Sequence, residues 1–87
     1  MSAPHAATLV FDYPAPESAR LVERAVEGEL DEIAGDRTRA ALSREGRIVE
    51  IRITADDLVA LRAGLNTWCT LVEVAESAGG LDGDAAP

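Results

Sequence analysis

Two adjacent carboxylates, Asp56 and Asp57, are the side chains of this sequence that come nearest to an acid–base pair or a metal-ligand set. They follow Thr54, which we expect to be a helix N-cap, and they begin the longest helical pattern, residues 54–78. Acidic side chains are favoured in the first turn of a helix, because its unpaired N–H groups carry a partial positive charge. We therefore interpret the pair as a helix start and not as a catalytic or metal site.

The other reactive side chains are isolated. His5 is the only histidine, and Cys69, expected to be a packing residue, is the only cysteine. Together they provide neither a zinc ligand set nor a histidine-based catalytic triad. A single cysteine forms no internal disulfide, which fits a reducing, cytoplasmic location. The sequence therefore predicts a protein that is not an enzyme and uses no metal or cofactor.

Charge is distributed unevenly along the 87 residues. There are 16 acidic and eight basic side chains, a net charge of −8, and every basic residue is arginine. Residues 37–52 hold five arginines against two glutamates, so this segment carries +3 and the rest of the chain −11. The overall charge argues against non-specific binding to nucleic acid or to anionic membranes. The acidic, lysine-free, alanine-rich composition is typical of a halophilic organism.

Hydrophobic alternation and helical periodicity predict five elements in the order strand, helix, strand, strand, helix. They are the strands 7–13, 37–43 and 47–54 and the helices 17–29 and 54–78. Gly46 suits a tight hairpin between the last two strands, because glycine readily adopts positive φ. This order predicts one α+β domain over residues 7–78, after a disordered lead-in (1–6) and before an acidic disordered tail (79–87). No apolar run is long enough for a membrane span.

The two strands of the hairpin separate apolar from basic side chains. Their alternation places the apolar residues on one face and Arg37, Arg39 and Arg52 on the other. An antiparallel sheet commonly presents one polar face to water. The alternative is a face that contacts RNA or a protein partner, and the sequence leaves both open.

The helical pattern 54–78 is apolar over more than half of its circumference, wider than the ~100° arc that one surface helix normally buries. One stripe is expected to pack on the chain's own sheet; it consists of Leu58, Leu61, Leu65, Trp68, Val72 and Ala75. The neighbouring stripe is rich in small residues and is expected to receive a partner helix. Its interface residues are Ala60, Gly64, Thr67, Leu71 and Val74.

Gly64 is the centre of that second stripe. Glycine inside a helix costs roughly 1 kcal/mol relative to alanine, so close approach of another helix would compensate. We therefore expect Gly64→Leu to abolish partner binding and to leave the monomer fold largely intact. Arg62 and Asn66 lie on the polar side, and their role stays open between a local contact and a partner contact.

Three stretches resemble the small Pcc-type subunit of the KEOPS complex of archaea and eukaryotes: ATLVFDYP, RIVEIRITA and ADDLVALRAGLNTW. The most specific piece is the run from Ala60 to Asn66, Ala-Leu-Arg-Ala-x-x-Asn. The resemblance extends over residues 7–76. The arginine-only, acidic composition departs from a typical member and is what a version from a halophilic archaeon would look like.

The resemblance implies a three-stranded antiparallel sheet with two helices on one face. It also implies a homodimer whose helices pack against helices of the catalytic threonylcarbamoyl transferase subunit and so bridge two such subunits. The complex makes threonylcarbamoyladenosine in tRNA, and the small subunit, without catalytic residues of its own, assists tRNA engagement. Arg37, Arg39 and Arg52 are then the candidates for facing tRNA.

The alternative is a stand-alone RNA-binding module with a KH-like arrangement. A G-x-x-G motif is present at Gly80–Gly83, but it follows the last helix and contains Asp82. A KH domain places this motif between two helices, where it clamps the nucleic-acid backbone. We therefore do not interpret it as a phosphate clamp.

Overall fold

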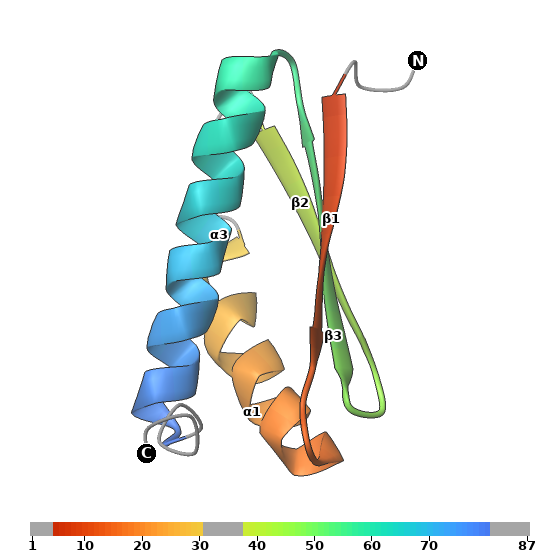
Figure 1. Ribbon diagram of the computed structural model, residues 1–87, viewed down its shortest axis with the longest axis vertical. Helices are drawn as coiled ribbons and strands as arrows, with labels where there is room; N and C mark the ends of the chain where they lie inside the picture. Colours follow the sequence, from red (N-terminus) through yellow and green to blue (C-terminus); the bar gives the residue numbers. More distant parts are fainter. Residues whose placement is uncertain (1–4, 31–37, 81–87) are drawn as a thin grey trace.

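The structure is a computed structural model that describes residues 5–30 and 38–80 (Figure 1). Its elements are β1 (His5–Asp12), α1 (Pro16–Glu27), β2 (Thr38–Glu45), β3 (Ile48–Ala55) and α3 (Leu58–Ala78). The predicted element order and α+β class are confirmed, because three antiparallel strands form one sheet and both helices lie on the same face of it. Within the described ranges, no helix is long and apolar enough to cross a membrane.

Strand β3 is the centre of the sheet. It pairs antiparallel with β1 on one side and with β2 on the other, so β1 and β2 run parallel to each other as the two edges. The register aligns the strands in rows of three, and the middle row is Leu9–Ile51–Leu42. Helix α1 therefore connects two strands that never touch.

The alternation of the strands gives the sheet a covered face and an open face. Val49, Ile51 and Ile53 of β3 are fully buried beneath the helices, whereas the residues between them are exposed or half-buried. Helix α1 packs over β2 and β3, and α3 packs mainly over β3 and β1. Trp68 of α3 and Val22 of α1 complete the core between the layers.

Strand β1 begins earlier than predicted. His5 and Ala6, assigned to a disordered lead-in, belong to the strand and pair with Ala55 and Thr54. The reason is that β3 continues to Ala55 and offers both of them a partner. The first four residues and the predicted tail beyond residue 80 lie outside the described residues.

The hairpin between β2 and β3 closes through two residues, Gly46 and Arg47, so Arg44 and Glu45 belong to β2 rather than to the turn. Gly46 has φ 61°, and in the described part of the chain only glycines, Gly46 and Gly80, have positive φ. Positive φ at the first turn position only is the pattern of a type II′ turn, whose twist matches that of the flanking strands.

Helix α3 begins at Leu58, and its N-cap is Asp57 instead of Thr54. The Oδ1 atom of Asp57 accepts a hydrogen bond from the backbone N–H of Ala60 at 2.8 Å. Thr54 is unavailable for capping, because it lies within β3 and pairs with Ala6 and Arg39. The acidic pair is thus part of a helix start, as its position predicts.

Candidate partner interface

The small-residue stripe of α3 is divided between the core and the surface. Ala60 and Gly64 are buried against the chain's own sheet, Leu71 is half-buried, and Thr67 and Val74 are exposed. An ideal Cβ atom at Gly64 would lie 3.3 Å from Cγ2 of Ile53. The close approach expected at Gly64 is therefore present, but it is made to the sheet of the same chain.

The outward side of α3 carries a continuous uncharged surface, which we call the outer strip. The outer strip consists of Val59, Ala63, Thr67, Thr70, Val74 and Ala78, all exposed. Val59 and Val74 are the two largest apolar side chains of the strip, and they are 75% and 58% exposed. The strip is shifted around the helix from the predicted stripe, because the sheet already occupies the positions of Ala60 and Gly64.

A shallow hollow interrupts the outer strip near its middle. Its volume is about 350 Å³, and it is lined by Asn66, Thr67, Thr70 and Leu71. The small threonine side chains leave this hollow between larger neighbours, so a side chain from an opposing helix has a place to enter. Arg62 and Glu73, the charged residues of the exposed side, lie beside the strip and not on it.

The open face of the sheet holds the predicted arginine cluster. Arg39 stands opposite Thr54, and Arg52 stands opposite Ala41, so the two arginines are diagonal neighbours on adjacent strands. A hollow of about 110 Å³ lies there, lined by Arg39, Arg52 and Thr54 together with Ala40 and Ala41. Arg37, the third residue of the predicted cluster, lies outside the described residues.

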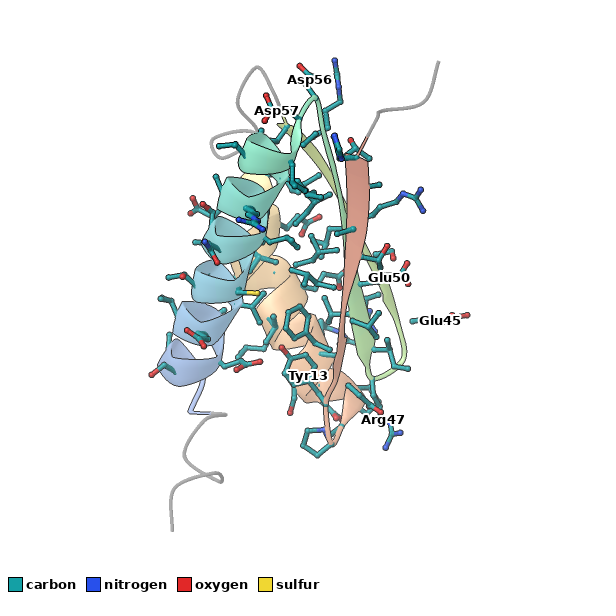
Figure 2. All side chains as sticks on the ribbon, turned by 45° about the horizontal axis from the view of Figure 1, so that its top comes forward. Tyr13, Glu45, Arg47, Glu50, Asp56 and Asp57 are labelled. Atoms are coloured by element: carbon teal, nitrogen blue, oxygen red, sulfur yellow. The ribbon has the colours of Figure 1, made fainter. Side chains whose placement is uncertain are left out.

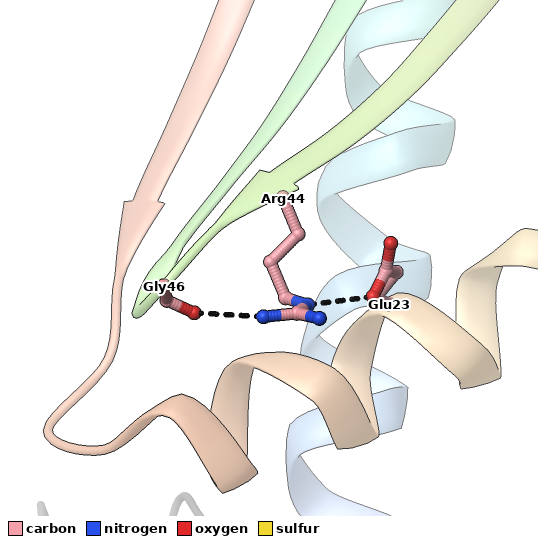
Figure 3. Close-up of polar contacts among 3 residues, drawn as sticks. All are labelled: Glu23, Arg44 and Gly46. Carbon is pink, nitrogen blue, oxygen red and sulfur yellow. Dashed lines mark hydrogen bonds and ion pairs between the residues drawn. The ribbon is translucent and has the colours of Figure 1, made fainter.

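Two further arginines of the basic segment have partners. Nε of Arg44 lies 2.7 Å from Oε1 of Glu23 on α1, and Nη1 donates to the backbone oxygen of Gly46 at 3.1 Å (Figure 3). Arg47 in the turn lies 3.7 Å from Asp12 at the end of β1. Arg44 therefore fastens α1 to the hairpin, and Arg39 and Arg52 are the arginines of the segment that make no ion pair with another described residue.

A buried tyrosine joins the segment between β1 and α1 to the last turn of α3. The Tyr13 hydroxyl donates a 2.6 Å hydrogen bond to Oε2 of Glu76 in the last turn of α3. Burial raises the pKa of Tyr13 well above its usual value, and the bond to the Glu76 carboxylate raises it further. No signal in the sequence links these residues, which are 63 positions apart.

The described residues contain no cluster of histidine, cysteine or acidic side chains able to hold a metal ion. Cys69, expected to be a packing residue, is exposed on α3 and is not buried by the chain itself. Asp57 is engaged as the cap of α3. These side chains do not converge on a common point, as Figure 2 shows for Asp56 and Asp57 at one end of the molecule and Tyr13 at the other.

Comparisons with known proteins give a family and a fold. No curated protein matches the sequence. The solved structure titled "Crystal structure of binary complex Gon7-Pcc1" contains a similar chain, with a TM-score of 0.80 and 16% sequence identity, over 92% of this chain and 98% of that one. The family model described as "Transcription factor Pcc1" matches residues 6–78, and on this match the chain belongs to the Pcc1 family.

Proposed function

We propose that this chain is a non-catalytic dimerisation and scaffold subunit of a KEOPS-type complex, which modifies tRNA to threonylcarbamoyladenosine. Membership of the Pcc1 family supports this role. The observation that carries the proposal is the outer strip, an uncharged surface that runs the full length of a 21-residue helix. A helix exposed in this way gains stability when another helix covers it.

In this proposal the outer strip docks helices of the catalytic threonylcarbamoyl transferase subunit. Of the five predicted interface residues, Thr67 and Val74 lie at this contact and Leu71 lines the hollow. Ala60 and Gly64 do not reach it, because they pack against the chain's own sheet. The small side chains on the strip permit a short distance between helix axes.

Bridging two catalytic subunits needs a second contact, between two copies of the chain. Among the described residues, strands β1 and β2 are the edges of the sheet, and an edge strand presents backbone N–H and C=O groups to a further strand. The related Pcc1 chain was solved in a binary complex with Gon7, which supports a surface that accepts another protein. We propose that a homodimer forms at such an edge.

The proposal also gives the assembled complex a tRNA contact through Arg39 and Arg52. Two guanidinium groups on either side of a hollow suit the oxygens of a phosphodiester. Because the chain as a whole is strongly acidic, we expect this contact to assist binding by the complex and not to retain tRNA alone.

The docking experiment compares two arginine substitutions on α3. Thr67→Arg places a charge on the outer strip, and Cys69→Arg places the same charge two residues along the helix, away from the strip; both positions are exposed. Affinity for the purified threonylcarbamoyl transferase subunit is measured by isothermal titration calorimetry. We expect Thr67→Arg to weaken binding at least ~10-fold, because an arginine buried at a helix contact lacks a partner charge. Cys69→Arg should bind as the wild type does.

Wild-type affinity in both variants would refute docking at the outer strip. An equal loss of affinity in both variants would also count against it, provided that circular dichroism shows both variants folded. Both positions are exposed on one helix, and neither side chain has a hydrogen bond to another described residue, so matched stability is expected.

A stand-alone RNA-binding module is the second candidate, and the hollow between Arg39 and Arg52 is the observation in its favour. A gel shift with tRNA and the isolated chain distinguishes the two. Tight binding that is lost in the double variant Arg39→Ser/Arg52→Ser supports the module. Binding that appears only when the catalytic subunit is added supports the scaffold.

A further inference from the structure

Helix α3 carries few charges for its length. Its charged side chains are Arg62, Glu73 and Glu76. Glu76 is half-buried and accepts the hydrogen bond from Tyr13. Arg62 and Glu73 are exposed, and neither makes an ion pair or a hydrogen bond with another described residue. The helix therefore presents one positive and one negative side chain that the rest of the described chain does not use.

The two charges lie on one line along the helix, which we call the charged margin. Arg62 and Glu73 are 11 positions apart. This spacing is close to three helical turns, so both residues point in nearly the same direction, roughly 16 Å apart along the axis. Asn66 lies between them, one turn after Arg62, and lines the hollow of the outer strip. The charged margin thus borders the outer strip, which contains no charged residue itself.

The isolated helix gains little from charges in this order. The helix dipole favours acidic side chains in the first turn and basic ones in the last, and α3 has neither. Its arginine lies in the N-terminal half and its unpaired glutamate in the C-terminal half, which is the opposite order. Ion pairs within a helix join residues three or four positions apart, so Arg62 and Glu73 are too distant to pair with each other. Contacts within α3 therefore do not explain either charge.

We propose that Arg62 and Glu73 determine which helix the outer strip accepts: a helix with a carboxylate beside Arg62 and a cation beside Glu73. This inference rests on the proposed docking of a partner helix at the outer strip. In helix pairs, charged side chains that flank the uncharged seam pair across it and set the choice and direction of the partner. Arg62 and Glu73 have such flanking positions, roughly 100° around the helix from the middle of the strip.

The same two charges fix the direction of the partner helix. Its carboxylate and its cation lie ~16 Å apart, so they are about 11 residues apart and share one side of that helix too. A helix docked in the reverse direction would bring its cation to Arg62 and its carboxylate to Glu73. Both contacts would then be repulsive, and such repulsion is a common source of specificity. Asn66 both donates and accepts hydrogen bonds, so a polar side chain of the partner can enter the hollow between the charges.

Charge reversal on α3 tests the inference. The variants are Arg62→Glu, Glu73→Arg and the double exchange, and the measurements are affinity and association rate with the purified threonylcarbamoyl transferase subunit. Arg47→Glu and Glu45→Arg are the matched controls, because they change the net charge equally at two other exposed positions. Figure 2 shows both at the hairpin, away from α3.

Each single reversal should weaken binding by ~3–10-fold at about 0.1 M salt and slow association, because an attractive contact becomes repulsive. The double exchange should weaken it by ~10–100-fold, since effects at distant sites add. The hairpin controls should stay within about 2-fold of the wild type. Both reversals put the charges of α3 in the order that the helix dipole favours, so the variants should be as stable as the wild type.

Salt separates an ionic contact from a change of shape. At about 1 M salt the Debye length falls to ~3 Å, and the difference between the wild type and each reversal should shrink below about 2-fold. A loss of affinity that persists at this salt concentration would overturn the inference.

The outcome for Thr67→Arg tells a failure of this inference from a failure of the proposed docking. Reversals that bind like their hairpin controls while Thr67→Arg binds weakly would overturn the role of Arg62 and Glu73 and leave docking at the outer strip standing. Wild-type affinity in Thr67→Arg would refute the docking itself and this inference with it.

Discussion

Replacing Gly64 by leucine should destabilise the isolated chain. The Cβ atom would already lie 3.3 Å from Cγ2 of Ile53 and 3.8 Å from Cγ2 of Thr38, and leucine adds three more carbon atoms beyond it. Overpacking of this kind typically costs 1–3 kcal/mol, whereas removing glycine from a helix interior gains roughly 1 kcal/mol. The difference is roughly 0–2 kcal/mol, and the three carbon atoms beyond the Cβ place Gly64→Leu in its upper half, ~1–2 kcal/mol. Such a loss lowers the melting temperature by about 5–15 °C for a domain of this size.

Urea unfolding followed by tryptophan fluorescence measures this change, because Trp68 is buried on the same helix. Gly64→Ala should be nearly neutral, since the helix gain offsets a contact that Ile53 relieves by a small shift. Ala63→Leu is the matched control on the exposed side and should stay within about 0.5 kcal/mol of the wild type. In the Gly64→Leu background, Ile53→Ala should cost less than the ~2–5 kcal/mol usual for such a truncation, because the leucine fills the space.

Gly64→Leu with wild-type stability would refute this reasoning. That result is what the sequence pattern predicts, because it assigns Gly64 to a partner contact outside the monomer. One measurement, the change in the free energy of unfolding, therefore distinguishes the two expectations: a loss if Gly64 packs on its own sheet, and little change if it packs on a partner. A Gly64→Leu chain that is stable but fails to bind the catalytic subunit would indicate that the partner binds the predicted small-residue stripe and not the outer strip.

Two further changes test the polar contacts of the helical layer. Asp57→Ala should cost about 1 kcal/mol of unfolding free energy through loss of the N-cap, while Asp56→Ala costs less; equal effects in urea unfolding would show that the cap is unimportant. Because the pKa of Tyr13 is raised in the folded chain, its contribution to stability is fully present below the ordinary tyrosine pKa of ~10 and is lost as pH rises above it. The urea midpoint of the wild type should therefore fall above pH 10 more steeply than that of Tyr13→Phe, which lacks the bond to Glu76; parallel curves would contradict this.

The elements of the fold could be predicted from the sequence because the strands alternate well enough between apolar and polar residues, most clearly in β3. Val49, Ile51 and Ile53 alternate with polar residues, and the structure buries them and exposes their neighbours. Gly46 likewise marked the hairpin, since the turn needs positive φ there. The resemblance to the Pcc-type family is confirmed over residues 6–78. The halophilic source remains a prediction from composition.

The partner surface could be predicted only in part. A helical pattern shows which residues share a stripe. Where two apolar stripes are adjacent, the pattern does not show which of them packs on the sheet and which is exposed to a partner. The sheet meets the helix at Gly64, so the core is rotated toward the small-residue stripe, and Leu58 of the expected core stripe is 51% exposed. Thr54 was misassigned as the cap for a similar reason, because its place in β3 depends on pairing with distant Ala6.

The central position of β3 has a consequence for the chain as it is synthesised. Strand β1 leaves the ribosome first, yet its partners lie between 36 residues (Asp12 to Ile48) and 50 residues (His5 to Ala55) further along. At 5–20 residues per second, β1 waits about 2–10 s with its apolar side chains unprotected. The β2–β3 hairpin, whose turn is two residues long, can close on its own in ~1–10 µs once it has emerged. Chaperone capture of this nascent chain should therefore concentrate on β1 and end when β3 appears.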